Sequence, residues 1–278
     1  MEWVQTLNDA IEYIEEHLCE DIQCEDVSNA VHISSYHFQR AFTLLSGMTI
    51  QTYIRNRRLS LAGEELLTPG TKVIDVALKY RYESVESFSK AFQRFHGIAP
   101  SKMSKERSLK SFHRISLRII MEGGAMEYRL EEHDRMKLCI HSKRFTSETS
   151  DKEIPKLWEE YYQNELYKKV PCHLGICGQM KENEKEFFYG IGANAEDLEL
   201  IPQGFEELTI PANTWVIFKS KGQNPDAIQR TWERIYSEWM PSTKHEVIQD
   251  YCIENYLPGD SSSTDYVSEI WLPVKRRG

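Results

Sequence analysis

The chain has 278 residues, of which 40% are hydrophobic and 28% charged, and its 34 Lys and Arg face 43 Asp and Glu for a formal net charge of −9. This length and composition predict about two globular domains and exclude a disordered chain. Because no apolar run approaches the roughly 18 residues of a membrane span and the N-terminus has no secretory signal pattern, we expect a cytoplasmic protein without a membrane partner.

The charge is unevenly distributed along the chain. Residues 1–33 contain nine acidic residues and no Lys or Arg, whereas residues 34–110 contain thirteen Lys and Arg against six acidic residues. Residues 111–278 are acidic again. A basic segment inside an acidic chain indicates a polyanionic partner for that segment, although a solvated basic face produces the same asymmetry.

The first hundred residues have the periodicity of helices separated by short breaks. Apolar residues at three- and four-residue steps predict an amphipathic helix over 3–18 and a long helix over 50–67. The other predicted helices are 26–31, 73–78 and two that begin after the candidate N-caps Ser34 and Ser84 and end at Gly47 and Gly97.

An internal repeat lies within the basic segment. Residues 38–42 (Phe-Gln-Arg-Ala-Phe) and Gly47 recur fifty residues later as residues 88–92 (Phe-Ser-Lys-Ala-Phe) and Gly97. Each copy follows a short apolar helix and a tight connection, which is the order of a helix-turn-helix. Two copies joined by the long helix predict two DNA-reading helices, although helix packing alone would also produce such a repeat.

From about residue 112 the pattern becomes a mixture of strands and helices. Alternation predicts strands over 114–119 and 126–130, and helical periodicity predicts helices over 154–167 and 225–239. The other predicted strands are 186–191, 214–218, 250–256 and 267–273. We therefore expect two domains, an all-α domain over 1–107 and an α+β domain over 108–278, divided within the polar stretch 104–112.

The six cysteines carry no metal-binding pattern. They have no CxxC spacing and no companion His or Cys pair at zinc-finger spacing. We expect reduced thiols, no metal and no cofactor.

Four segments of the N-terminal region carry a family resemblance. Segments 34–42, 53–59, 77–84 and 88–100 occur in the order found in the DNA-binding domain of AraC/XylS-type transcription regulators, which residues 3–104 resemble. The resemblance implies a double helix-turn-helix that binds double-stranded promoter DNA, with RNA polymerase as a further partner.

The spacing of polar residues fits DNA reading independently of this resemblance. Tyr36, Gln39 and Arg40 fall at i, i+3 and i+4, on the face away from Phe38 and Phe42, and Arg and Gln make bidentate contacts to guanine and adenine. Arg55 and Arg58 are either phosphate contacts or partners of the acidic first helix, and Glu86 either accepts from cytosine or repels phosphate. The candidate DNA-binding residues are Ser34, Ser35, Tyr36, Gln39, Arg40, Arg55, Arg58, Ser84, Val85, Glu86, Ser87 and Lys90.

Two departures from the family pattern lie in the second unit. The family usually has Gly where this chain has Arg81, and a Tyr-Arg pair where this chain has Met103-Ser104. A residue other than Gly at a positive-φ turn position costs on the order of 1 kcal/mol. We expect weaker DNA binding by this unit, unless Arg81 itself reaches a phosphate.

Six short segments of the C-terminal region carry a second resemblance. Segments 154–158, 188–192, 210–218, 239–242, 253–256 and 269–273 follow the order of the GyrI-like effector-binding domain, which residues 114–275 resemble. This implies a duplicated strand-helix-strand-strand fold with a central ligand groove. An AraC-type domain followed by this one is the arrangement of Rob-like regulators.

One acidic residue is singled out in this region. Strand alternation places Cys252, Glu254 and Tyr256 on one face, and the resemblance implies that the acid at position 254 meets cationic ligands. A carboxylate among aromatic residues is costly unless a cation pairs with it, so the alternatives are that Glu254 faces solvent or pairs with an Arg. The candidate ligand-binding residues are Glu254, Trp215, Tyr189, Trp158 and Tyr256, where Trp215 and Tyr189 form pocket walls unless they belong to the core.

These features predict a sequence-specific transcription regulator whose C-terminal pocket binds a hydrophobic, cationic small molecule. One alternative is a GyrI-like hydrolase of reactive small molecules that uses Glu254 and Tyr189 as acid/base and water positioner. The other is a regulator controlled only by its abundance. We assign no catalytic residues in the leading interpretation, because the sequence has no nucleophile elbow and no metal motif.

Overall fold

The computed structural model describes residues 2–103, 109–117, 126–146, 149–179, 186–248 and 250–276. The chain forms two compact units. The helical unit consists of Glu2–His32 with Phe42–Arg118, and the sheet unit consists of Ile33–Ala41 with Ile119–Gly278. The predicted division between residues 107 and 108 lies outside the described residues.

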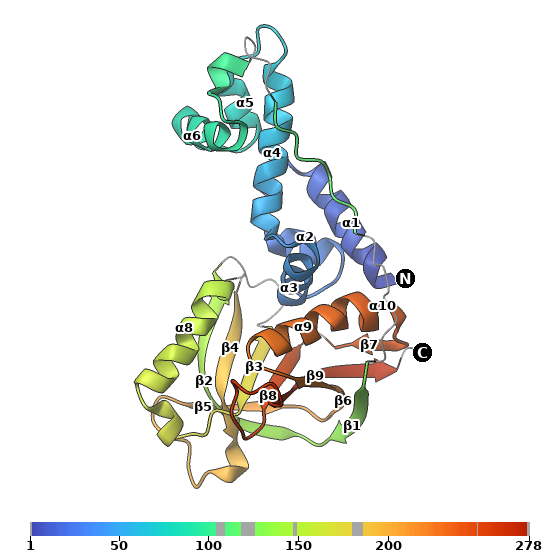
Figure 1. Cartoon of the computed structure of the whole chain (residues 1–278), viewed down its shortest axis with the longest axis vertical. Helices are drawn as coiled ribbons and strands as arrows, with labels where there is room; N and C mark the ends of the chain where they lie inside the picture. Colours follow the sequence, from blue (N-terminus) through green and yellow to red (C-terminus); the bar gives the residue numbers. More distant parts are fainter. Residues whose placement is uncertain are drawn as a thin grey trace. The chain divides into compact units, whose positions relative to one another are not determined.

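All six helices predicted in the first hundred residues are present (Figure 1). They are α1 (Glu2–Glu16), α2 (Cys24–Ala30), α3 (Ser35–Ser46), α4 (Ile50–Leu66), α5 (Val73–Lys79) and α6 (Val85–His96), followed by the 3₁₀ turn η1 (Pro100–Lys102). The capping residues account for the bounds of α6. The Ser84 side chain accepts a hydrogen bond from the Ser87 N–H at 3.1 Å, and Gly97 ends the helix with φ +86°.

The repeated phenylalanines form the inward face of each motif. Phe38 and Phe42 on α3 and Phe88 and Phe92 on α6 are fully buried. In the second motif, α4, α5 and α6 pack around a core that includes Leu59, Phe88 and Phe92. Because the apolar residues of each helix face inward, the polar residues between them are directed away from this core.

The turn between α5 and α6 places Arg81 in the left-handed region, with φ +65°. The corresponding turn between α2 and α3 does the same with His32, at φ +55°. We expect Arg81→Gly to raise the free energy of unfolding by about 1 kcal/mol, because glycine has no Cβ to clash with the backbone there. Urea denaturation of the full chain measures this change.

The control for this prediction is Arg94→Gly in the exposed part of α6, where glycine should lower the stability by about 1 kcal/mol. A lower stability of Arg81→Gly would contradict the strain argument. DNA affinity of the same variant tests the phosphate hypothesis, since an unchanged affinity would show that Arg81 makes no DNA contact.

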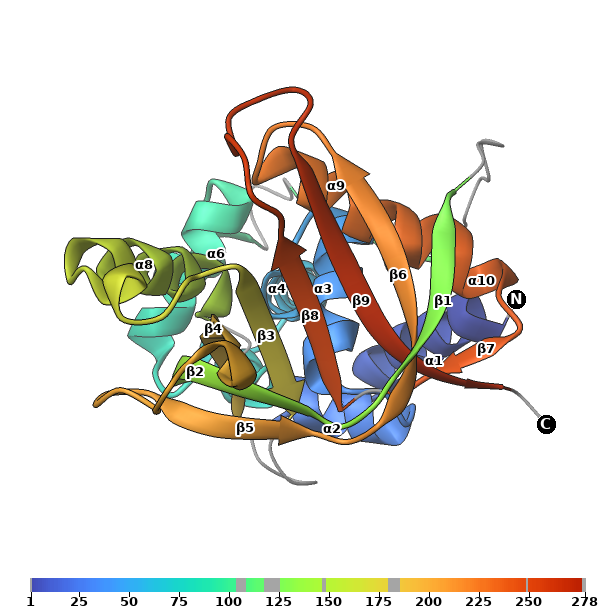
Figure 2. The same ribbon diagram turned by 90° about the horizontal axis from the view of Figure 1, so that it is seen from below.

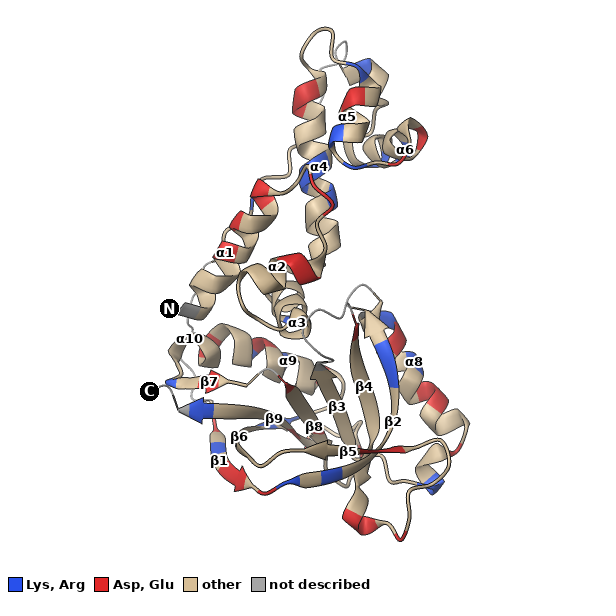
Figure 3. Cartoon of the chain, turned by 180° about the vertical axis from the view of Figure 1, so that it is seen from behind, with Lys and Arg blue, Asp and Glu red and all other residues tan. Residues whose placement is uncertain are grey.

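The helix α1 carries several acidic residues, which are red in Figure 3. Two of them form ion pairs with basic residues of the same unit. Glu15 pairs with Arg57 of α4 at 2.7 Å, and Glu12 pairs with Arg114 at 2.6 Å. Arg58 donates to the backbone carbonyls of Leu18 and Glu20. Two basic residues of segment 34–110, Arg57 and Arg58, are therefore held by contacts within the helical unit.

The sheet unit contains nine described strands in one antiparallel sheet of order β1-β6-β9-β8-β3-β4-β2-β5, with β7 paired to β9. The strands are β1 (Tyr128–His133), β2 (Met136–Thr146), β3 (Leu174–Gln179), β4 (Glu186–Asn194), β5 (Glu206–Ile210), β6 (Asn213–Lys221), β7 (His245–Val247), β8 (Tyr251–Tyr256) and β9 (Val267–Arg276). The helices are α8 (Ser150–Gln163), α9 (Asp226–Arg234) and α10 (Met240–Ser242), with the π-helical turn η4 (Ile235–Trp239) after α9 and the 3₁₀ turns η2 (Leu166–Lys168) and η3 (Ala195–Asp197).

The topology confirms the duplicated strand-helix-strand-strand fold. The first copy is β2-α8-β3-β4 and the second is β6-α9-β8-β9, and the copies meet where β3 pairs with β8. The helices α8 and α9 lie on the same face of the curved sheet, behind the strands in Figure 2. A separate cluster around Ile176, Trp215 and Ile253 fills the opposite face.

Several strand predictions differ from the structure. The described part of the predicted strand 114–119, Arg114–Leu117, belongs to the helical unit and forms no strand, and its remaining residues lie outside the described ones. The strands β2, β3, β5 and β7 were not predicted from the sequence. In β2, Leu138, Cys139 and Ile140 are consecutive buried residues, so the strand has no clean alternation to recognise.

None of the helices in the described part of the chain has the length and the apolar composition that a membrane span requires. The described residues also contain no cluster of three or more His, Cys, Asp or Glu that could hold a metal ion.

Candidate effector site and nucleic-acid interface

Glu254 lies on β8, at the junction of the two copies of the fold, and is 7% exposed. Its Cα pairs across the sheet with that of Gly175 on β3. The side chain points to the face that carries α8 and α9, because it receives hydrogen bonds from residues of α9 and β4. The prediction that this acid lies in a short apolar strand is confirmed, and of the alternatives given for its side chain the structure shows the pairing with an Arg, which is Arg40.

Aromatic donors surround the Glu254 carboxylate. Oε1 accepts from Trp232 Nε1 at 2.7 Å, and Oε2 accepts from the hydroxyls of Tyr256 at 2.8 Å and Tyr189 at 3.5 Å. Trp158 Nε1 donates to the Tyr189 hydroxyl at 3.1 Å. Burial, reinforced by the Glu254 carboxylate, raises the pKa of both Tyr189 and Tyr256 well above that of an ordinary phenol, so both remain donors at neutral pH.

Gly175 makes room for this arrangement. A Cβ on Gly175 would lie 2.3 Å from the Tyr189 hydroxyl oxygen and 3.5 Å from the Tyr256 ring. The missing side chain therefore lets Tyr189 lie over β3 and reach Glu254.

If the site binds the hydrophobic cation expected from the sequence, Gly175→Ala should lower the affinity for it about 10-fold, because the new methyl group pushes the Tyr189 hydroxyl away from Glu254. Gly178→Ala is the matched control. Gly178 lies on β3 like Gly175, but its added methyl group would lie 2.3 Å from the Phe188 ring of β4. Phe188 packs against the cluster on the opposite face of the sheet. Calorimetric titration should separate the two variants, and an equal loss of affinity in both would contradict a local role for Gly175.

The guanidinium of Arg40, in the first half of α3, lies against the Glu254 carboxylate. Arg40 Nη2 is 3.1 Å from Glu254 Oε1, and Arg40 Cζ is 4.2 Å from the centroid of the Trp232 ring. Nη1 donates to the Tyr36 hydroxyl, and Nη2 lies 3.5 Å from Gln229 Oε1. Burial alone lowers the pKa of Arg40, but Tyr36 and Glu254 outweigh it and hold that pKa well above its ordinary value.

Neighbouring contacts hold the same segment of α3 in the sheet unit. His37 Nδ1 and the Tyr236 hydroxyl are 2.8 Å apart, and the Tyr36 ring lies 4.9 Å from the Phe187 ring. Burial, followed by the charge of Arg40, lowers the pKa of His37 to about 4, so this imidazole is neutral at pH 7. Tyr236 belongs to the π-helical turn after α9, an irregularity that is frequent at functional sites.

Four of the five predicted ligand-binding residues lie together: Glu254, Tyr189, Tyr256 and Trp158. The expectation that Trp215 forms a wall beside them is corrected. Trp215 is fully buried in the cluster on the opposite face, where its ring lies 6.1 Å from that of Trp271. Alternation fixes which residues share a face but not which face the helices cover.

The contacts that Trp232 makes with Glu254 and Arg40 were not predicted from the sequence. Trp239, seven residues further along the chain, packs against Phe218 instead. The indole N–H of Trp232 was the available signal, because a buried tryptophan usually finds an acceptor.

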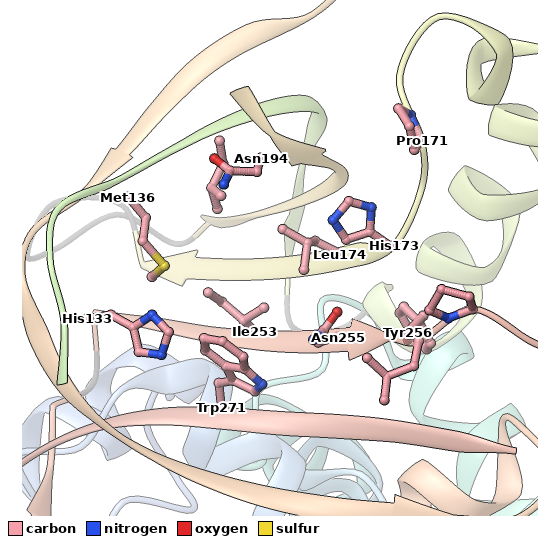
Figure 4. A pocket seen from close by; sticks show the side chains of 13 residues that line it. His133, Met136, Pro171, His173, Leu174, Asn194, Ile253, Asn255, Tyr256 and Trp271 are labelled. Carbon is pink, nitrogen blue, oxygen red and sulfur yellow. The ribbon is translucent and has the colours of Figure 1, made fainter. Parts of the chain in front are cut away.

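A cavity of about 670 Å³ opens on the face of the sheet opposite to Glu254 (Figure 4). Ile253 and Trp271 contribute to it from β8 and β9, and His133 and His173 lie at its borders. The residues that line it carry no carboxylate. This cavity suits an apolar molecule, and the Glu269 carboxylate, which accepts hydrogen bonds from the lining residues Asn255 and Trp271, is already paired with Arg129.

The predicted DNA-reading residues of α6 are exposed. They are Ser84, Val85, Glu86, Ser87 and Lys90. Glu86 and Lys90 pair with each other at 3.0 Å, with side chains 79% and 74% exposed. Arg55 on α4 is also exposed, whereas Arg58 donates to carbonyls near the end of α1, which matches the alternative role predicted for it.

The predicted reading residues of α3 have a different environment. Ser34 and Gln39 are buried, Ser35 and Tyr36 are half-buried, and the Arg40 side chain is 15% exposed. The two copies of the motif therefore differ in how accessible their reading residues are.

Together, the two helix-turn-helix motifs and the Glu254 site define a DNA-binding regulator with a small-molecule binding domain. Residues 126–275 match the GyrI-like small molecule binding domain, and residues 27–106 match a helix-turn-helix domain. The chain belongs to the GyrI-like family and combines it with an AraC-type DNA-binding domain in the arrangement of Rob.

Several proteins are similar to this chain. The transcriptional regulator Rob of Salmonella typhimurium is 22% identical over 299 residues, which cover 99% of this chain and 100% of Rob. The transcriptional activator AarP of Providencia stuartii is 37% identical over 34% of this chain and 70% of AarP. The uncharacterized regulator YbfP of Bacillus subtilis is 38% identical over 36% of this chain, but the match spans only 34% of YbfP.

Two solved structures are similar to about half of this chain. A putative transcription regulation protein of Staphylococcus aureus MU50 is 22% identical, with a TM-score of 0.49, over 54% of this chain and 99% of that protein. The structure of SAV2435 bound to tetraphenylphosphonium is 23% identical, also with a TM-score of 0.49, over 54% of this chain and 94% of that protein.

Proposed function

We propose that this regulator binds promoter DNA through α3 and α6 and responds to a hydrophobic cation bound at Glu254. The observation that carries the proposal is the buried carboxylate enclosed by Trp232, Tyr189 and Tyr256. A carboxylate supplies the opposite charge, and aromatic faces add a cation–π attraction of about 0.5–2 kcal/mol. We place the protein in the cytoplasm, with RNA polymerase as a further partner and no cofactor.

The proposed DNA contacts are the exposed polar residues of α6, the reading face of α3, and Arg55 as a phosphate contact. Phosphate contacts make DNA affinity strongly salt-dependent, whereas a bidentate base contact adds about 1–3 kcal/mol of discrimination. Two reading helices in one chain make a monomer sufficient to contact two segments of major groove.

The experiment that tests this function has two parts. Selection of bound sequences from random duplexes, with the full chain, should yield a defined operator. Calorimetric titration with tetraphenylphosphonium, a lipophilic cation without hydrogen-bond donors, should show one binding site. Failure to enrich any sequence would reject the DNA part, and failure to bind lipophilic cations would reject the effector part.

The cavity lined by Ile253 and Trp271 is the competing location for an effector. Ile253→Trp fills that cavity and points away from Glu254, because neighbouring residues of β8 face opposite sides of the sheet. We expect Ile253→Trp to leave cation binding unchanged. Loss of binding in this variant, together with normal binding by Glu254→Gln, would place the effector in the cavity lined by Ile253 and Trp271 instead.

A hydrolase is the second candidate function, and one observation favours it. The Tyr189 hydroxyl lies 3.5 Å from Glu254 Oε2, which is close enough for the two to act on one water molecule. Turnover of a reactive cyclopropane-bearing electrophile, lost in Glu254→Gln, would support it. A chain that neither binds cations nor turns over electrophiles would instead be regulated by abundance.

A further inference from the structure

The reading residues of α3 and α6 differ in what surrounds them. On α6 the side chains of Glu86 and Lys90 are 79% and 74% exposed. On α3 the Arg40 side chain is only 15% exposed and Gln39 is buried, although these residues occupy the corresponding face of the first motif. The segment that contains them, Ile33–Ala41, belongs to the sheet unit.

Arg40 makes the contacts that a cationic effector would make. Its guanidinium pairs with the Glu254 carboxylate at 3.1 Å and lies 4.2 Å from the centroid of the Trp232 ring. These are the charge and the aromatic face on which cation recognition at this site depends. The Tyr36 hydroxyl accepts a further hydrogen bond from the same guanidinium.

We propose that Arg40 is the resident cation of the effector site, so that a cationic effector and Arg40 compete for Glu254 and Trp232. The effector then acts by releasing Arg40 and the reading face of α3 for DNA. This inference rests on the proposed function, because it names the regulation of the same site. It also identifies the effector class as an apolar cation that can replace a guanidinium.

The direction of the coupling follows from mutual exclusion. A single Arg40 side chain cannot pair with Glu254 and contact a base edge at the same time. DNA and effector therefore both bind the state in which Arg40 has left the site, and each must increase the affinity of the other by the same factor. A factor of about 10 is within the usual range for such coupling.

The chemistry of the pair makes its displacement feasible. A guanidinium and a carboxylate taken out of water lose much of their hydration, and their mutual attraction does little more than offset that loss. A lipophilic cation with a delocalised charge is weakly hydrated and gains more by leaving water than Arg40 does. It can therefore take the place of a charge that the chain itself provides.

The test uses the full chain, tetraphenylphosphonium and a selected operator duplex at fixed salt. In the wild-type chain, tetraphenylphosphonium should raise DNA affinity about 10-fold, and saturating DNA should raise tetraphenylphosphonium affinity by the same factor. Arg40→Ala should bind tetraphenylphosphonium about 10-fold more tightly than wild type in the absence of DNA, because the internal competitor is gone. Lys90→Ala, on the exposed helix α6, should weaken DNA binding without changing the affinity for the cation.

A second variant tests the release of α3 through a measurement of DNA affinity. Glu254→Gln removes the charge that holds Arg40, so it should raise DNA affinity about 10-fold without effector and abolish the response to tetraphenylphosphonium. Glu199→Gln, an exposed acid of the same unit, is the control and should behave as wild type.

Failure of the inference and failure of the proposed function give different results. If wild type binds tetraphenylphosphonium and Glu254→Gln does not, but Arg40→Ala shows no tighter binding, the effector site stands and the competition is overturned. Antagonism between DNA and cation would also overturn it. If no variant binds the cation, the effector assignment fails, and an unchanged DNA affinity in Glu254→Gln would then overturn the competition as well.

Discussion

Replacing Glu254 by Gln is expected to lower the affinity for tetraphenylphosphonium about 100-fold, or about 2.7 kcal/mol. The substitution keeps the shape of the side chain, and its amide oxygen can still accept from Trp232 or Tyr256. What disappears is the negative charge, which in a site of low effective dielectric interacts with a nearby cation by a few kcal/mol. Calorimetric titration of the full chain measures the loss.

A neutral ligand of similar shape separates charge from packing. Triphenylphosphine oxide carries aromatic rings without a net positive charge, so its affinity should change little between the wild-type chain and Glu254→Gln. If both ligands lose affinity equally, the variant has altered the shape of the site and the electrostatic explanation is wrong. If neither loses affinity, Glu254 takes no part in binding.

Replacing Arg57 by Met is expected to lower the stability of the chain by about 3 kcal/mol. Arg57 binds the Glu15 carboxylate through Nε at 2.8 Å and Nη2 at 2.7 Å, and its Nη1 donates to the Phe112 carbonyl. The Tyr53 hydroxyl donates to the same carboxylate at 2.7 Å. The side chains of Arg57 and Glu15 are only 11% and 13% exposed. Removal of Arg57 therefore leaves the Glu15 carboxylate charged, unpaired by this Arg and poorly solvated.

The matched control is the other ion pair of α1. Arg114 and Glu12 pair at 2.6 Å, but their side chains are 44% and 55% exposed, so Arg114→Met should change stability little. Chemical denaturation of both variants provides the comparison. Equal losses would contradict the burial argument, and rescue of Arg57→Met by an added Glu15→Leu would support it.

Local patterns predicted the helical unit well. The helix periods, the N-cap at Ser84 and the C-terminal Gly97 are short-range features, and each has its expected geometry in the structure. The left-handed conformation at Arg81 was expected from the family resemblance, because the family usually has Gly at this turn position. Such features depend on residues within one or two turns, so the sequence around them contains the information needed.

Long-range pairing explains the errors in the sheet unit. β2 has consecutive buried residues because both of its faces are covered: Leu138 and Ile140 pack into one cluster and Cys139 into another, which cannot be seen within the strand itself. The expectation that Trp215 lies beside Glu254 was wrong, and the contact of Trp232 with Glu254 was not predicted, for the same reason. Only the register between β6, β9 and β8 places Trp215 on the face of the sheet that is opposite to Glu254, and only the position of α9 brings Trp232 to Glu254.

The distribution of charge shows the same difference between what the local sequence determines and what only the folded chain determines. The linear order of residues already separates an acidic first helix from a basic segment with a repeated motif, because composition and periodicity are local properties. Which basic residue meets which acid is set by the folded chain: Arg57 pairs with Glu15, and Arg40 pairs with Glu254 more than two hundred residues away. Ion pairs of this kind act over a few ångströms in space, so no pattern along the sequence could have specified them.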